Sequence, residues 1–95
     1  MESVNILTRP SYLRSLKKFS ESEITEINSA IALLPEAMGK PHVHSGLGIR
    51  KLGKAMFEIR AGLQTRVLFA RESGDLVLVF AGNHNQVHAW LKENV

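Results

Sequence analysis

Residues 56–71 read MFEIRAGLQTRVLFAR, and this stretch decides the fold. Apolar side chains recur at every second position on both sides of a central Gly-Leu-Gln, as in two antiparallel strands joined by a three-residue turn. With this turn Phe57 faces Phe69, and the apolar side chains share one face; a slip of one residue would put them on opposite faces. The same register places Arg60 opposite Arg66 on the other face.

A third strand follows this hairpin. The Ser-Gly turn at 73–74 suits a two-residue connection, because glycine adopts a positive φ at no steric cost. The resulting register predicts that Arg66 faces Ala81. It also predicts that Val67 faces Phe80, which places Phe80 on the apolar face. Strands are predicted at 49–52, 56–61, 65–71 and 75–81.

The N-terminal part of the chain is expected to add a strand and two helices. Residues 4–8 have the pattern of a short strand. Residues 10–19 begin with a proline, which suits a first helical turn, and repeat apolar side chains at helical spacing. Ser20 and Glu23 match a capping box, which opens a second helix that should end near 35–38.

The order of these elements indicates an α+β fold. An N-terminal strand and helical hairpin should pack on an antiparallel β-meander that is followed by a C-terminal helix over 84–93. We expect the helices to lie on one face of the sheet, and the loop at 39–48, with His42 and His44, to be solvated. A chain of 95 residues has room for one core, so residues 1–95 are expected to form a single domain.

The composition excludes several classes of protein. The chain has no cysteine, which excludes disulfide frameworks, thiolate zinc sites and cysteine nucleophiles. No apolar run approaches the roughly 18 residues of a membrane span, and no signal peptide is visible at the N-terminus. We therefore expect a cytoplasmic protein that does not bind membranes.

Basic residues are concentrated in one window of the chain. Residues 40–71 contain seven Lys and Arg against a single acid, so this window carries a charge of +6 and the remainder −3. A cationic face of this kind attracts polyanions; the alternative is a basic surface that is only solvated. Together with Asn83 at the end of the last strand, the residues expected to bind phosphate are Arg50, Lys51 and Lys54.

Arg60 and Arg66 should face each other close to the point where the last strand ends, at Asn83 and His84. Two arginines paired across a hairpin repel each other by about a few tenths of a kcal/mol or more. A bound phosphate would offset this repulsion, because guanidinium groups match its geometry. The alternative is a surface ion pair with Glu58.

Two further signals have a structural interpretation. His84 and His88 lie four residues apart, as in zinc-binding pairs, but no third ligand converges on them, so no metal is expected. Trp90 could stack on a base, but its helical spacing with Val87 and Leu91 favours a position in the core.

Four motifs between residues 46 and 92 resemble the RelE/ParE toxin superfamily: GLGIRKL, FEIR, TRVLF and a final GNH before a helix. The N-terminal strand and helical hairpin fit the same fold, so the resemblance covers nearly the whole chain. It implies a small toxin that is encoded beside an antitoxin, often cleaving mRNA in the ribosomal A site. The reaction that it implies needs no metal or cofactor.

The resemblance also implies roles for individual residues. The arginine at the position of Arg66 contacts the scissile phosphate, Arg60 matches a second basic position, and His84 matches a basic or histidine residue after the last strand. The substrate's 2′-hydroxyl attacks the adjacent phosphorus and expels the 5′-oxygen, while the arginines stabilise the growing charge. Glu58 is the candidate base and His84 the candidate acid. Because no tyrosine follows the last strand, these two roles could be exchanged, or Lys54 could take one of them.

Two other functions remain open from the sequence. A ParE-like toxin would bind DNA gyrase through a protein-binding surface with no catalytic acid and base. A non-catalytic relative would keep the basic face and bind RNA without turnover. The expected proximity of Glu58, Arg60, Arg66 and His84 favours the nuclease.

Overall fold

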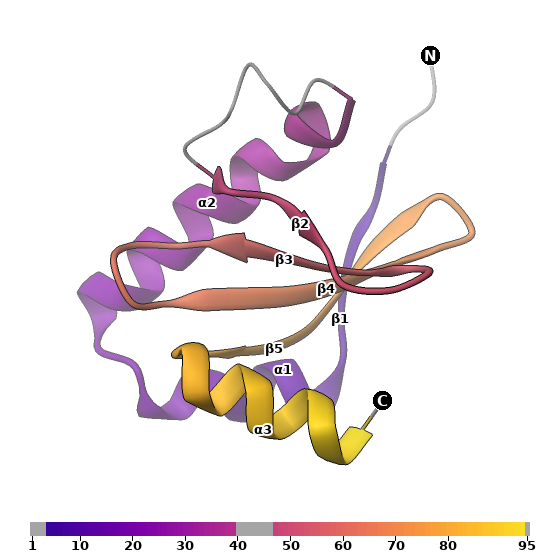
Figure 1. The fold of residues 1–95 in the computed structure, drawn as a ribbon. Coiled ribbons are helices and arrows are strands. Elements are labelled where there is room, and N and C mark those ends of the chain that lie inside the picture. Colours follow the sequence, from indigo (N-terminus) through magenta and orange to yellow (C-terminus); the bar gives the residue numbers. More distant parts are fainter. Residues whose placement is uncertain (1–3, 40–46, 95) are drawn as a thin grey trace.

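The computed structural model describes residues 4–39 and 47–94, so residues 40–46 of the expected loop, with His42 and His44, lie outside the described residues. Figure 1 shows the arrangement of the elements. In chain order they are β1 (Ile6–Thr8), α1 (Pro10–Ser15), the 3-10 helix η1 (Leu16–Lys18), α2 (Glu21–Gly39), β2 (Arg50–Lys51), β3 (Met56–Arg60), β4 (Arg66–Glu72), β5 (Asp75–Gly82) and α3 (His84–Asn94).

One sheet carries the fold, with the strand order β1-β5-β4-β3-β2. Strands β2 to β5 form the expected antiparallel meander, and β1 pairs with β5 in parallel. The α+β fold is therefore confirmed. None of the helices in the described part of the chain is long and apolar enough to cross a membrane.

The register of β3 against β4 agrees with the alternation of apolar residues. Phe57 pairs with Phe69, and Arg60 pairs with Arg66. The two phenylalanine rings stack with their centroids 5.3 Å apart. Both rings belong to the core between the sheet and α2, so their burial fixes the register of the hairpin. This register places the two arginines opposite each other beside the turn.

The register of β5 against β4 differs from the prediction. Phe69 faces Leu78 as expected, but Leu68 faces Phe80, which leaves Val79 as an extra residue in β5. Such a bulge shifts every later pair by one position. The predicted pairs Arg66–Ala81 and Val67–Phe80 are therefore wrong.

Beyond the bulge, Arg66 faces Gly82 and Val67 faces Ala81. Phe80 does not join the core beneath α2 but packs in the other cluster, where it stacks on Trp90 with 5.7 Å between ring centroids. The bulge thus places an aromatic pair on the face that carries Arg66.

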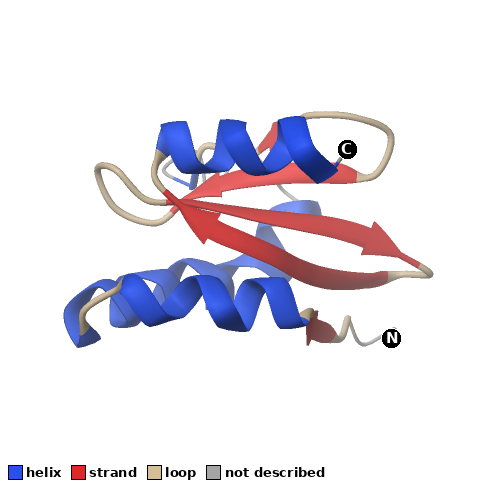
Figure 2. Ribbon diagram, turned by 90° about the horizontal axis from the view of Figure 1, so that it is seen from below, coloured by secondary structure: helices blue, strands red, loops and turns tan. Residues whose placement is uncertain are grey.

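The helices lie on both faces of the sheet, and the expectation that they share one face is wrong (Figure 2). Helices α1 and α2 cover one face, where Ile27 and Leu34 pack against β3, β4 and β5. Helix α3 covers the other face, where Val87 packs on Leu68 and Ala70. Because β4 is apolar at consecutive positions, both of its faces need a cover.

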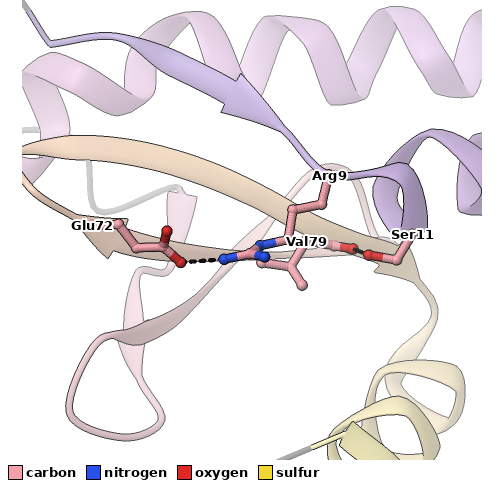
Figure 3. A network of polar contacts seen from close by, with 4 residues as sticks. All are labelled: Arg9, Ser11, Glu72 and Val79. Atoms are coloured by element: carbon pink, nitrogen blue, oxygen red, sulfur yellow. Dashed lines mark hydrogen bonds and ion pairs between the residues drawn. The ribbon is translucent and has the colours of Figure 1, made fainter.

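The start of α1 is held against β5 and β4. The Arg9 N–H donates to the Leu78 carbonyl over 3.0 Å, and the Ser11 hydroxyl donates to the carbonyl of Val79, the extra residue of the bulge, over 2.7 Å. The Arg9 guanidinium forms an ion pair with Glu72 (Figure 3). These contacts fix α1 beside the part of β5 that β1 does not pair.

Further along, α1 and η1 satisfy the backbone of β5 that β1 leaves unpaired. The Ala81 N–H donates to the Ser15 hydroxyl over 3.0 Å, and Lys18 Nζ donates to the Ala81 carbonyl over 2.8 Å. Ser11, Ser15 and Lys18 follow one another at steps of four and three residues, which puts them on one side of the helix. Helix α1 therefore replaces a neighbouring strand at this edge.

The capping box at the start of α2 is confirmed. The Ser20 N–H donates to Glu23 Oε1 over 2.8 Å, and the Glu23 N–H donates to the Ser20 hydroxyl over 3.2 Å. These hydrogen bonds lower the pKa of Glu23 below its ordinary value of 4.5. The helix therefore begins where the sequence pattern indicates.

Candidate functional site

Arg60 and Arg66 form the centre of the candidate site, facing each other where β3 ends and β4 begins. Arg60 is exposed, whereas the side chain of Arg66 is only 20% exposed. Two positive charges on adjacent strands are unfavourable without an anion nearby. The pairing therefore concentrates positive charge at this end of the hairpin.

Glu58 lies beside Arg66 and is itself buried, with 10% of its side chain exposed. Its Oε1 lies 3.8 Å from Nε of Arg66, within range of an ion pair but too far for a hydrogen bond. This Nε is buried and has no hydrogen-bond partner. The Glu58 carboxylate thus compensates the positive charge of Arg66 from a buried position on the same face of the sheet.

A pocket of about 290 Å³ opens beside Arg66. The turn between β3 and β4 contributes Leu63 and Gln64 to its walls, and the start of α3 contributes the rest of them. Arg66 and His84 therefore border one cavity, as the sequence predicts. The residues from the start of α3 are Asn83, His84 and Asn85.

Asn83 caps α3. Its Oδ1 accepts a hydrogen bond from the Gln86 N–H over 2.8 Å, and its own N–H donates to Gln86 Oε1 over 2.9 Å. The N–H groups of His84 and Asn85 belong to the first turn, so they have no partner within the helix. His84 and Asn85 themselves line the pocket, and the N-terminus of a helix favours a negative charge. An Asn-x-x-Gln pattern would have indicated this cap from the sequence.

Gly48 lies against the side chain of Arg60. A Cβ on Gly48 would come within 3.2 Å of both Cδ and Nε of Arg60. The φ angle of Gly48 is +57°, which few side-chain-bearing residues adopt. The preceding residue, Leu47, is buried in the core and anchors this contact. Sequence reasoning did not find this contact, although Gly48 belongs to the GLGIRKL motif.

The other predicted phosphate-binding residues do not all lie at this end. Arg50 faces Glu58 across β2 and β3, on the face of the arginine pair, whereas Lys51 faces Phe57 and lies on the opposite face. Lys54 precedes β3, at the end of the strand away from Arg60. The structure therefore places Arg50 on the face of the arginine pair, and it brings neither Lys51 nor Lys54 to that end of the hairpin.

Lys54 instead lines a cavity of about 780 Å³ between α3 and the β2–β3 connection. Its other walls include Met56, Leu91 and His88. His88 follows His84 along α3, with ring centroids 4.8 Å apart. Within residues 4–39 and 47–94, no three His, Asp or Glu side chains are grouped to hold a metal ion.

No family model matches the chain, and no curated protein matches it in sequence. Solved toxin structures match its fold. YafQ from Escherichia coli has a TM-score of 0.71 at 9% identity, covering 90% of this chain and 98% of YafQ. A copper-bound mutant toxin from Helicobacter pylori has a TM-score of 0.67 at 16% identity, over 90% and 99%.

A chain of the RelB–RelE antitoxin–toxin complex from Methanococcus jannaschii has a TM-score of 0.66 at 14% identity. The match covers 88% of this chain and 96% of that one. The three similarities establish that this protein has the RelE-like toxin fold, as the sequence motifs indicated.

Proposed function

We propose that this protein is the toxin of a type II toxin–antitoxin system and an endoribonuclease that cleaves mRNA on the ribosome. The observation that carries the proposal is the position of Arg66. It borders a pocket with His84 and the amino end of α3, faces Arg60, and has Glu58 beneath it. The RelE-like fold of the chain supports the same assignment.

The pocket suits a phosphodiester. The 2′-hydroxyl of the RNA gives up its proton to water and attacks the adjacent phosphorus, the bond to the 5′-oxygen breaks, and a 2′,3′-cyclic phosphate remains. Negative charge grows on the non-bridging oxygens in the transition state. Arg66, Arg60 and the N–H groups at the start of α3 would stabilise that charge, and one such group is worth about 3 to 4 kcal/mol.

The nucleophile belongs to the substrate, so the protein needs to supply only positioning, charge and proton transfer. We assign His84 to protonate the leaving 5′-oxygen, because it is exposed and borders the pocket. Glu58 is the candidate base from the sequence. Its burial and its position 3.8 Å from Arg66 favour another role, which is to orient the arginine.

The proposed partners follow from the same site. Free toxin would stop translation, so the cell needs an antitoxin that covers the arginine pair. RelE and YafQ have both been solved in complexes with antitoxins, RelB and DinJ. We propose a cognate antitoxin for this chain too, and a cytoplasmic location, where ribosomes translate mRNA.

Induction in cells tests the proposal. Wild-type protein should arrest growth and produce mRNA ends within translated codons, whereas Arg66→Ala should do neither. Co-expression of the neighbouring antitoxin gene should restore growth. Intact mRNA with an SOS response would instead identify a toxin that acts on gyrase. Intact mRNA without an SOS response would identify a non-catalytic relative.

A further inference from the structure

A basic groove lies between α1, η1 and α3, on the side of α3 away from Lys54. Its volume is about 420 Å³. Phe80 and Trp90, the aromatic pair placed by the β5 bulge, form one wall. The other wall, from α1 and η1, consists of Ser11, Arg14, Ser15, Lys17 and Lys18.

The charge of this groove is not neutralised. Residues 10–19 contain three basic side chains and no acid. Arg14 and Lys17 are exposed, and neither forms an ion pair with any residue that the structure describes. Both side chains are therefore available to an anionic ligand.

Lys18, in the wall of the groove, is held in place by two contacts. Its Nζ donates to the Ala81 carbonyl and lies 4.6 Å from the centre of the Phe80 ring. An ammonium group has three N–H donors, so this hydrogen bond leaves others for a ligand. Lys18 therefore supplies a fixed positive charge beside the end of β5.

The groove is connected to the candidate active site. A third cavity, of about 260 Å³, shares Lys18 with the basic groove and shares Gln64 and Asn83 with the pocket at Arg66. The carboxylate in its wall, Glu23, accepts a hydrogen bond from the Ser20 N–H. The three cavities thus adjoin one another between Arg66 and Lys17, and together they are called the path.

We propose that this path binds a further stretch of single-stranded RNA, which we name the α1 subsite, formed by Arg14, Lys17, Lys18, Phe80 and Trp90. The inference rests on the proposed nuclease function. The basic side chains contact phosphates next to the one cleaved at Arg66, and Trp90, which is half-buried in the wall of the groove, offers a surface against which a base packs. Grooves that combine cations with aromatic rings are typical of single-strand binding.

The test compares two double variants that remove equal charge. Arg14→Gln/Lys17→Gln changes the subsite, and Arg71→Gln/Lys92→Gln removes two exposed charges elsewhere on the surface. Lys18 is left intact because its hydrogen bond supports β5. The probe is a fluorescein-labelled single-stranded RNA of about 12 nucleotides, 2′-O-methylated so that it is not cleaved.

Anisotropy titrations at several salt concentrations give the slope of log affinity against log salt. The slope for the subsite variant should be smaller than that of wild type by about 1.4, because each phosphate contact contributes about 0.7. The control variant should keep the wild-type slope. Trp90 is the single tryptophan of the chain, so RNA should also change its fluorescence in wild type and less in the subsite variant.

Three results would overturn the proposal. The first is an equal slope for the subsite variant and the control variant, and the second is the absence of RNA binding by wild type at low salt. The third is a subsite variant that keeps the wild-type RNA slope but loses affinity for an oligo-glutamate peptide. The last would identify a surface for an acidic protein segment. Failure of the nuclease function is separate, since it shows as intact mRNA in induced cells. The α1 subsite is wrong if wild type cleaves mRNA and these slopes are equal.

Discussion

Nε of Arg66 lies 3.8 Å from Oε1 of Glu58, and both side chains are largely buried in the face of the sheet that carries the candidate site. A buried carboxylate without a cation nearby is costly. We therefore expect the two residues to depend on each other, with Glu58 orienting the guanidinium and Arg66 compensating the carboxylate. On the proposed function, stability and activity would be linked at this position.

Replacing Arg66 with alanine should reduce both properties. The loss of the guanidinium removes transition-state stabilisation and should slow mRNA cleavage by about 10²- to 10³-fold. It also leaves Glu58 buried without its cation, which should lower the free energy of unfolding by about 1 to 3 kcal/mol. Cleavage assays and thermal unfolding measure the two effects.

The double variant Arg66→Ala/Glu58→Gln is the control, because it also removes the buried charge. It should regain much of the lost stability and none of the activity. Recovery of cleavage in the double variant would show that Arg66 acts only by neutralising Glu58.

Glu58→Gln alone tests whether this carboxylate positions Arg66 or acts as the base. We expect kcat to fall by up to about 100-fold, because Arg66 is no longer held in its productive orientation. The acid limb of the pH–rate profile should remain, since Glu58 is not the group that takes the 2′-hydroxyl proton. Loss of that limb would assign the base role to Glu58.

Gly48→Ala should impair the site through Arg60. The substitution places a methyl group against Cδ and Nε of Arg60 and requires alanine at a φ of +57°, at a cost of about 1 to 2 kcal/mol. Cleavage should fall while the protein stays folded. Gly53→Ala is the matched control, since a Cβ there meets no atom within 4 Å. Equal cleavage activity of the two variants would show that Gly48 does not affect the site through Arg60.

The α2 capping box should make stability depend on pH. The hydrogen bonds from Ser20 lower the pKa of Glu23 in the folded state, so this contribution is present above the unfolded pKa and is lost as pH falls through the folded pKa. In Glu23→Gln the amide oxygen can still accept the hydrogen bond without titrating. Between neutral pH and about pH 3, the melting temperature of wild type should fall more than that of this variant. Parallel decreases would contradict the assignment.

The sequence predicts the β3–β4 hairpin well because its strands carry a clear signal. Apolar side chains face the core beneath α2 at Phe57 and Phe69, and a shift by one residue would expose them. The start of α2 was predictable for a similar reason, since Ser20 and Glu23 interact locally.

The β5 register was not predictable in the same way. Residues 76–81 are apolar without interruption, so no alternation favours one pairing, and the bulge at Val79 depends on contacts with α1 and α3. The same limit applies to the site. Local patterns place Arg60 and Arg66 together, whereas the α1 subsite arises only when residues 14–18 pack beside β5.

The most direct test of the central claim uses purified protein, ribosomes carrying a defined mRNA, and analysis of the RNA ends. We predict cleavage within the codon in the ribosomal A site, leaving a 2′,3′-cyclic phosphate on one product, and a loss of about 10²- to 10³-fold in Arg66→Ala. Intact mRNA with folded wild-type protein, or equal cleavage by wild type and Arg66→Ala, would contradict the account.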